Sequence, residues 1–393
     1  MEAVARLPRE RLRSREEWRT HLLTLIDEAA PMLEREAPLA DQQGRLTPPV
    51  IEFLRNQDLL KLKLPAALGG AEGDNALQFE IYEKIAYYHA AAAWCCFIYT
   101  DIIALVSSML PDAGLEVLFA KGLPLICGGG GRVLGTLAAA NGGYAVEGRF
   151  AYGSGLSGSD WVAVMAADPA TPTTPVMCVV PSDAARSLDN WNVLGLQGTG
   201  SADFVIEGAI VPDVLTFTIG SKPLRGGPNS RLGVTGLIGH TVPAVALGVA
   251  RRSLDDLVTF AREKQRGYLV RQTIGGRQAF QAFLATADLK LKAARALMLD
   301  NGLQLAEVAA SGADTAPMEA ETRAAGTWVT EQALLIASDI IRWAGGEAIR
   351  QGSRFERALR DIQVASTHYC ISNTSLESHG QYLLGIANIP AEA

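Results

Sequence analysis

The chain is short of the residue patterns that build metal sites and disulfide frameworks. Its five cysteines are odd in number, and its five histidines are scattered along 393 residues. Neither set has the close, regular spacing of zinc ligands, so we expect no metal site. Cysteines without a pairing pattern are typical of reduced thiols in the cytoplasm.

Positive charge and long apolar runs are also scarce. Lys and Arg total 35 against 42 Asp and Glu, and no basic stripe is present, which argues against a nucleic-acid partner. No stretch reaches about 18 uninterrupted apolar residues, the length of a membrane-spanning helix. The charged N-terminus is followed by no apolar run of the kind found in secretory signals. The sequence therefore predicts a cytoplasmic protein without a membrane partner.

A fingerprint for a nicotinamide nucleotide is missing as well, because no Rossmann motif is present. The four glycines at 128–131 lack the strand-to-helix context and the lysine of a phosphate loop. We interpret them as a loop near the mouth of an active site.

What the chain does have is a change of pattern along its length. Residues 1–122 carry apolar residues at helical spacing, and 229–393 contain long helical segments rich in Ala and Leu. Residues 123–228 are rich in Gly and Pro and show the alternation of strands. We predict an α+β protein with an N-terminal helical domain, a middle β domain built as a small barrel or a sandwich, and a C-terminal helical bundle.

The element boundaries can be predicted from the same patterns. Helices are expected at about 75–90, 91–108, 234–265, 276–311, 316–343 and 353–383. Strands are expected at 161–165 and 176–180, with a further pair, 204–206 and 209–212, around a turn.

Three local motifs occur in this helical, β, helical order. Leu59–Pro65 is followed by Gly69-Gly70, Leu194–Ser201 is followed by Val211-Pro212, and Arg357–Asp361 lies near the C-terminus. Together they resemble the acyl-CoA dehydrogenase superfamily along nearly the whole chain. The resemblance implies that family's fold, with a middle β-barrel domain, a C-terminal four-helix bundle and a homotetrameric assembly.

Within that superfamily the chain resembles the oxygen-using branch more than the dehydrogenases. The stretches at 142–150, 154–155 and 159–161 follow that branch's middle-domain pattern, and 128–132 replaces the dehydrogenases' Thr-Glu-Pro stretch. Tyr369 stands where the dehydrogenases commonly hold their catalytic carboxylate, and His368 precedes it. The resemblance implies the oxygenase component of a two-component flavin monooxygenase.

Such a protein would use reduced flavin (FADH2 or FMNH2) and O2, and would act through a C4a-hydroperoxyflavin. A separate NAD(P)H-dependent flavin reductase would be its partner. The implied reaction is hydroxylation of a small aromatic or heteroaromatic compound of the phenol, indole or indole-acetate type. The sequence does not choose between FAD and FMN.

The resemblance implies catalytic roles for Ser154 and His368. A small hydroxyl can accept a hydrogen bond from flavin N5–H, so Ser154 is the first candidate, with Gly155, Thr199 and Ser201 beside the cofactor. An imidazole, with an ordinary pKa near 6.5, can exchange a proton at neutral pH, which suits His368. The structural alternatives are a turn serine and a satisfied histidine on a half-buried helix.

Further residues are predicted to contact the substrate and the flavin nucleotide. Trp94, Tyr99 and Asp101 lie on one apolar segment where relatives contact the substrate, and Tyr369 lies beside His368. Core packing and a solvated helix charge are the alternatives for that segment. The resemblance implies contacts from Lys264 and Arg266 to the flavin phosphates. It also implies that Gln278, Gly345 and Gly346 contact the nucleotide of a neighbouring subunit. The alternative is that these residues are solvated positions of helices and turns.

Two other functions stay open at this point. A true acyl-CoA dehydrogenase would need a displaced base, for which Glu377 is the candidate, and would hold oxidised FAD tightly. A non-catalytic flavin-fold subunit would give no turnover with reduced flavin and oxygen.

Overall fold

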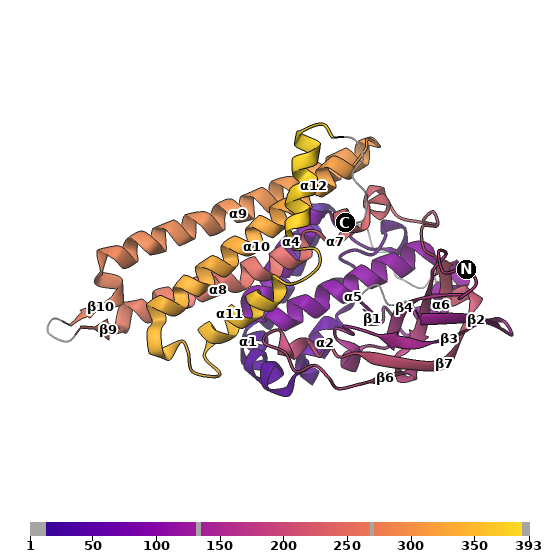
Figure 1. Ribbon diagram of the computed structural model, residues 1–393, viewed down its shortest axis with the longest axis horizontal. Coiled ribbons are helices and arrows are strands. Elements are labelled where there is room, and N and C mark those ends of the chain that lie inside the picture. Colours follow the sequence, from indigo (N-terminus) through magenta and orange to yellow (C-terminus); the bar gives the residue numbers. More distant parts are fainter. Residues whose placement is uncertain (1–12, 131–134, 268–270, 387–393) are drawn as a thin grey trace. The chain divides into compact units, whose positions relative to one another are not determined.

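A computed structural model describes residues 13–130, 135–267 and 271–386, and these residues form two compact units (Figure 1). The first, called the sheet unit, comprises the described parts of 1–73, 94–193 and 197–231. The second, called the bundle unit, comprises the described parts of 74–93, 194–196 and 232–393. The predicted division into three domains, 1–122, 123–228 and 229–393, stays a prediction.

The sheet unit is built on one eight-stranded sheet, in which β1 pairs with β4 off the path β6-β7-β3-β2-β4-β5-β8. Its strands are β1 (Ile126–Gly128), β2 (Gly135–Ala140), β3 (Gly143–Phe150), β4 (Trp161–Ala167), β5 (Val176–Pro181), β6 (Ala185–Ser187), β7 (Phe204–Pro212) and β8 (Thr216–Thr218). Most neighbours are antiparallel, whereas β1 and β2 both run parallel to β4. Buried and exposed residues alternate at the start of β2, whereas β4 and β5 are buried along most of their length. In the core the rings of Phe150 and Phe204 stack 5.4 Å apart.

Helices complete the sheet unit. They are α1 (Arg15–Gln43), α2 (Pro48–Leu54), α3 (Gln57–Leu60), α5 (Ala90–Met109) from Trp94 onward, and α6 (Asp112–Leu118). The sequence signals at two of their starts are visible in the structure. Ser14 and Glu17 form a reciprocal capping box at the start of α1, and prolines occupy the first turn of α2 after Thr47.

The predicted pair of strands at 204–206 and 209–212 is wrong. β7 is one continuous strand that passes through Gly208, whose φ of 75° lies in the left-handed region that glycine tolerates. Its partner β3 changes register between Val146 and Gly148, so a bulge absorbs the irregularity and the chain does not reverse.

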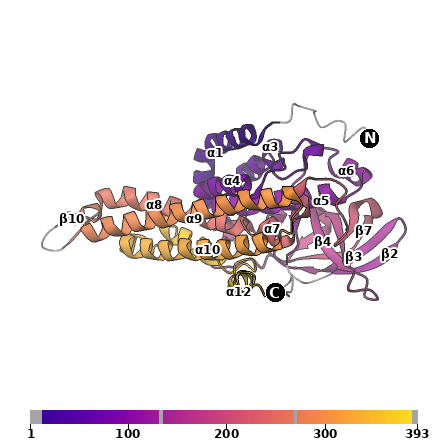
Figure 2. The same ribbon diagram turned by 90° about the horizontal axis from the view of Figure 1, so that it is seen from above.

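The bundle unit consists of long helices packed side by side, as Figure 2 shows for α8, α9 and α10. Its helices are α4 (Asn75–Tyr88), α7 (Val234–Ile238), α8 (Thr241–Glu263), α9 (Gln278–Ser311), α10 (Ala316–Ala344), α11 (Arg354–Ala365) and α12 (Asn373–Leu383). A two-stranded ribbon of β9 (Gln265–Arg266) and β10 (Gln272–Thr273) joins α8 to α9. The helices expected at 75–90, 276–311 and 316–343 are confirmed, whereas the one expected at 234–265 is divided into α7 and α8 by a turn at Gly239 and His240.

The single helix predicted at 353–383 is in fact two, α11 and α12, joined by residues 366–372. The side chains of Ser366 and Thr367 bond back to the carbonyls of Gln363 and Val364, a local alternative to continuing the helix. His368 therefore lies in a tight link between helices, not on a helix.

Close approach of α4 and α8 sets the packing of the bundle unit. Gly248 lies against the backbone of α4, so that an added Cβ would overlap Glu83 O and lie 2.9 Å from the Ala86 Cβ. Farther along the pair, Tyr87 donates to Asp255 over 3.0 Å, and on the other side Arg295 of α9 pairs with Glu80 and Glu83 of α4. The small residue lets two long helices meet at backbone distance.

His89 joins α4 to α5. It is the C-cap of α4, its carbonyl accepts from Ala93 N, and its ring Nδ1 accepts from Ala92 N over 3.3 Å. The side chain is 3% exposed, and burial, assisted by the positive charge of Arg357, lowers the His89 pKa to about 3. The imidazole is therefore neutral at physiological pH.

Two helices of the described chain, Ala90–Met109 and Val234–Glu263, are long and apolar enough to cross a membrane. Their most apolar windows are 67% and 72% buried inside the protein. Burial of that extent is typical of core helices, whose apolar faces are used in packing.

Gly248 and Gly380 provide a matched test of the packing. Gly248→Ala should destabilise the fold by about 1–3 kcal/mol, because the new methyl group meets the α4 backbone. Gly380→Ala, on a helix where no atom lies within 4 Å of the new Cβ, should instead stabilise by about 0.5–1 kcal/mol. Denaturant unfolding of both variants measures the two values, and equal effects would contradict the close approach of α4 and α8.

Acid should destabilise the protein through His89. A histidine whose pKa is lower in the folded state binds its proton preferentially when unfolded. The contribution of the neutral His89 ring to the free energy of unfolding is complete above about pH 6.5. Below that pH it decreases by up to about 1.4 kcal/mol per pH unit. His89→Ser keeps a capping oxygen and removes the titration. Unfolding free energies measured from pH 8 to pH 5 should fall less steeply for this variant, and an unchanged slope would refute the buried neutral imidazole.

Candidate functional site

A chain of buried hydroxyl groups lies in the sheet unit. Trp94 Nε1 donates to Ser154 Oγ over 3.3 Å, Ser154 Oγ lies 2.7 Å from Ser201 Oγ, and Ser201 Oγ lies 2.6 Å from Thr199 Oγ1. All four side chains are buried. The structure thus brings together four of the residues that the sequence assigned to cofactor and substrate.

The local backbone explains how Ser154 reaches this position. The chain leaves β3 through Tyr152, at φ 57°, and Gly155, at φ 75°, so that two left-handed residues flank the Gly153-Ser154 pair. Gly155 N donates to Thr199 O over 2.9 Å, and Tyr99 donates its hydroxyl to Gly155 O over 2.6 Å. A Cβ at Gly155 would overlap the Tyr99 hydroxyl, so only glycine fits there.

The donor set of this hydroxyl chain fits the polar edge of a flavin ring. That edge presents oxygen acceptors together with a nitrogen that carries a hydrogen when the flavin is reduced. A hydroxyl can donate and accept, so it can pair with either partner, and it is neutral, which suits an uncharged ring. The burial of the hydroxyls keeps water away from such a contact.

Tyr99 and Asp101 are tied into the sheet unit by their own partners. The Tyr99 hydroxyl proton is used by Gly155 O, and burial raises the pKa of this phenol. Asp101 Oδ1 lies 2.6 Å from Lys63 Nζ, and both side chains are largely buried. Burial raises the Asp101 pKa and the ammonium of Lys63 opposes that shift. Both residues hold the helix in place, and their contact with a substrate stays a prediction.

His368 lies in the α11–α12 link of the bundle unit and is half-buried. Its Nδ1 accepts from Cys370 N over 3.3 Å, so the neutral ring carries its proton on Nε2. Burial lowers the His368 pKa to about 4. The neighbouring Tyr369 ring is exposed, with its centroid 4.6 Å from the imidazole, and Arg323 holds the link by donating to Tyr369 O and Cys370 O.

The alternative carboxylate base has a different environment. Glu377 is exposed on α12. Exposure leaves a carboxylate hydrated, which is the opposite of the desolvated position that strengthens a base toward a weakly acidic substrate.

The residues predicted to contact the flavin nucleotide lie near the β9–β10 ribbon. Figure 1 shows this ribbon at one end of the long helices of the bundle unit. Lys264 Nζ pairs with Glu347 over 3.0 Å, and the Arg266 guanidinium packs against Gly345, where an added Cβ would overlap it. Arg277, which directly precedes Gln278, donates to Arg266 O over 3.1 Å. Gly346 lies in the short 3-10 turn between Gly345 and Glu347.

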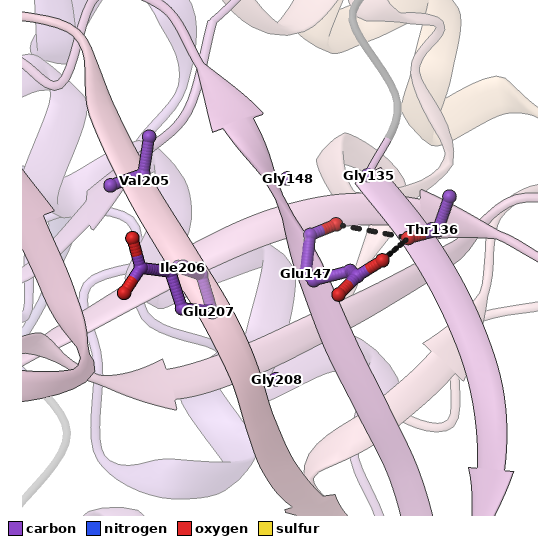
Figure 3. Close-up of a pocket in the computed structure, with 8 residues that line it drawn as sticks. All are labelled: Gly135, Thr136, Glu147, Gly148, Val205, Ile206, Glu207 and Gly208. Atoms are coloured by element: carbon purple, nitrogen blue, oxygen red, sulfur yellow. Dashed lines mark hydrogen bonds between the residues drawn. The ribbon is translucent and has the colours of Figure 1, made fainter.

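A separate hollow lies on the surface of the sheet (Figure 3). Residues from β2, β3 and β7 line it: Gly135, Thr136, Glu147, Gly148, Val205, Ile206, Glu207 and Gly208. None of them was predicted as a site residue, and of its two carboxylates Glu207 pairs with Arg186 over 2.9 Å. Gly131 and Arg132, from the predicted mouth loop, lie outside the described residues.

Two polar residues of the bundle unit were missed in the sequence. The Nε2 of His89 is buried without a hydrogen-bond partner among the described residues, and Arg357, although part of a recognised motif, was assigned no role. The sequence contains only a weak indication that either residue has a functional role. A single histidine before the apolar run Ala90–Trp94 does not show whether its ring is satisfied.

Comparisons with known proteins show what the chain is similar to in sequence and in fold. Residues 240–373 match the family described as acyl-CoA dehydrogenase, C-terminal domain. The chain is 25% identical over 354 residues to an indole-3-acetate monooxygenase of Pseudomonas putida, covering 89% of this chain and 90% of the relative. It is 24% identical to the flavin-dependent monooxygenase oxygenase subunit HsaA of Rhodococcus jostii, covering 87% and 92%.

The solved structure of XiaF from Streptomyces sp., a complex with FADH2 and glycerol, superposes with a TM-score of 0.85 at 18% identity. The match covers 96% of this chain and 98% of that one. The predicted fold, with helical parts on either side of a β part in the chain, is thereby confirmed. Residues 240–373 therefore resemble the acyl-CoA dehydrogenase C-terminal domain, the chain has the acyl-CoA dehydrogenase-like fold, and the relatives to which it is similar over most of its length include flavin-dependent monooxygenases.

Proposed function

We propose that this chain is the oxygenase component of a two-component system that hydroxylates a small aromatic or heteroaromatic compound of the phenol, indole or indole-acetate type. A separate NAD(P)H-dependent reductase delivers the reduced flavin. The observation that carries the proposal is the buried, neutral chain of hydroxyls from Ser154 to Thr199. The name of the Pseudomonas putida relative supports the substrate class.

Reduced flavin is the cofactor and O2 the co-substrate, and the bound flavin supplies the electrons that activate oxygen. Ser154 binds the polar edge of the flavin ring. Because Trp94 donates to Ser154 and Ser201 lies 2.7 Å away on its other side, the hydroxyl is held in one orientation. Such preorganisation avoids the cost of reorienting a dipole during the reaction.

Exclusion of water is the second task of the sheet unit. Ser154, Thr199 and Ser201 are each at most 5% exposed, and the rings of Trp94 and Phe97 pack 5.0 Å apart beside them. A dry, weakly polar wall slows proton exchange with the solvent, and it strengthens the few hydrogen bonds that remain.

His368 acts as a hydrogen-bond donor in this proposal. Its Nδ1 lone pair is used by Cys370 N, so Nε2–H is the group that can face a reacting oxygen. With a pKa of about 4 the ring is neutral over the working pH range, and it stabilises developing negative charge by donation. Taking a proton from the substrate would require the Cys370 contact to break or the tautomer to change.

The phosphate end of the bundle unit supports binding of a flavin nucleotide. Lys264 and Arg266 supply positive charge, and Gly345 and Gly346 allow close backbone approach. Gln278 and the glycine pair would contact the nucleotide of a second copy in a homotetramer. These assignments are part of the proposal.

Single-turnover kinetics test the proposed function. Anaerobic protein with reduced flavin is mixed with oxygenated buffer, with and without an aromatic substrate, and flavin oxidation and product are followed together. The protein should delay flavin oxidation relative to free flavin and yield hydroxylated product. Oxidation at the free rate without product would refute the oxygenase, and reduction of an artificial acceptor by an acyl thioester would favour the dehydrogenase.

Replacement of Ser154 tests the hydroxyl chain. Ser154→Ala should lower the fraction of reduced flavin that ends in product by on the order of ten-fold, the effect of one lost buried hydrogen bond of about 1–1.5 kcal/mol. Ser187→Ala, which removes an exposed hydroxyl of the same sheet, is the matched control and should leave the fraction unchanged. Equal yields for Ser154→Ala and the unmodified enzyme would remove Ser154 from the mechanism.

His368→Ala should lower product yield by about ten-fold or more while changing flavin affinity little, because the ring acts on oxygen chemistry and not on binding. His368→Gln, which keeps a donor, should recover part of the yield. A pH profile of the yield should lack an inflection near pH 6.5, since the His368 pKa lies well below that value. Loss of flavin affinity without loss of coupling would contradict this role.

A further inference from the structure

His89 presents a buried hydrogen-bond donor for which the described chain offers no acceptor. Its Nδ1 accepts from Ala92 N, so the proton of the neutral ring is on Nε2, on the far side of the imidazole from the helix start. Nε2 makes no hydrogen bond with any described residue, and the side chain is 3% exposed. An unmet donor at this depth costs about 1–3 kcal/mol, so such groups in native proteins usually serve a ligand or an ordered water.

Arg357 brings a positive charge to the same part of the bundle unit. It lies on α11, it is half-buried, and its charge is close enough to His89 to contribute to the lowering of the imidazole pKa. No carboxylate pairs with Arg357 in the described parts of the chain. The other arginines of this helix are paired, Arg354 with Asp256 over 2.7 Å and Arg360 with Glu356.

The start of α5 is already capped by the His89 ring, because Nδ1 accepts from Ala92 N, so the helix N-terminus plays no part at Nε2. A neutral N–H donor and a guanidinium both favour an anion. The nearby carboxylates do not supply it, because Asp255 and Asp256 pair with Arg251, Arg252 and Arg354.

We propose that His89 Nε2 and the Arg357 guanidinium bind the carboxylate of a small aromatic acid. The aromatic part of this statement rests on the proposed function, whereas the carboxylate follows from the two donors. The site thereby narrows the substrate class from aromatic compounds in general to those that carry an acid group.

A carboxylate fits this pair better than the other oxygen ligands. Its two oxygens can take one hydrogen bond from the imidazole and one or two from the planar guanidinium. Its single negative charge balances the single positive charge of Arg357. A phenol or amide would leave that charge uncompensated, and a phosphate dianion would exceed it.

The experiment compares phenylacetate with phenylacetamide, two ligands of nearly equal shape that differ in charge. Binding is measured by calorimetry with the full chain, both without flavin and with oxidised flavin. Phenylacetate should bind at least ten-fold more tightly than the amide. Arg357→Gln should remove that preference, and His89→Ser, which keeps a capping oxygen, should weaken phenylacetate binding by about ten-fold.

Arg354→Gln is the matched control, because it removes an arginine from the same helix that is exposed and already paired. It should leave the preference for the acid intact. Thermal unfolding of each variant separates loss of the site from loss of the fold, and Arg357→Lys, which keeps the charge, should retain part of the preference. Equal affinities for acid and amide, as expected if a water molecule satisfies His89, would overturn the proposal, as would an unchanged preference in Arg357→Gln.

These outcomes are separate from those of the proposed function. Charge-selective binding that depends on Arg357, combined with no oxygenation, would leave the anion site standing and refute the oxygenase. Oxygenation of neutral aromatic compounds without any preference for acids would support the oxygenase and refute the anion site.

Discussion

The hydrogen-bonded chain from Trp94 through Ser154 and Ser201 to Thr199 is the interaction on which the proposed flavin contact of the sheet unit depends. Each hydroxyl is buried, so each must be satisfied, and together the three fix one another's orientation. The left-handed backbone of Tyr152 and Gly155, which follow β3, places Ser154 in this hydrogen-bonded chain. A neutral polar wall of this kind can hold a flavin edge without introducing a charge that would attract water.

Burial keeps the imidazoles of two histidines in the bundle unit, His368 and His89, neutral. His368 and His89 have pKa values of about 4 and about 3, and each uses Nδ1 to accept from a backbone amide. In both cases the proton is therefore on Nε2, and both rings are donors at neutral pH. This is the property that separates a site stabilising negative oxygen from one that removes a proton with a carboxylate, the role for which the exposed Glu377 is poorly placed.

Several residues that carry charge are used to hold the fold, and this limits what they can do for a ligand. Asp101 is committed to Lys63, and Tyr99 to Gly155 O. Several arginines of the bundle unit meet a carboxylate, as Arg295 does with Glu80 and Glu83. Arg357 differs from the two other arginines of its helix in having no carboxylate partner among the described residues, and its charge acts on His89, whose Nε2 donor is unmet. Unmet groups of this kind are where ligands are expected.

The sequence by itself determined the helical, β and helical zones and most helix boundaries, because periodicity is a local property. Its resemblance to a known family, and not periodicity, pointed to the residues of the hydroxyl chain. The sequence did not determine which side chains form hydrogen bonds or ion pairs with one another. Ser154 meets Ser201 across 47 residues and Asp101 meets Lys63 across 38, and only tertiary packing brings such groups together. Packing also decided that β7 runs straight through Gly208, that residues 366–372 break the last helix, and that His89 is buried with its Nε2 unmet. Burial and pairing set the charge state and availability of each group, and neither can be read from the order of residues along the chain.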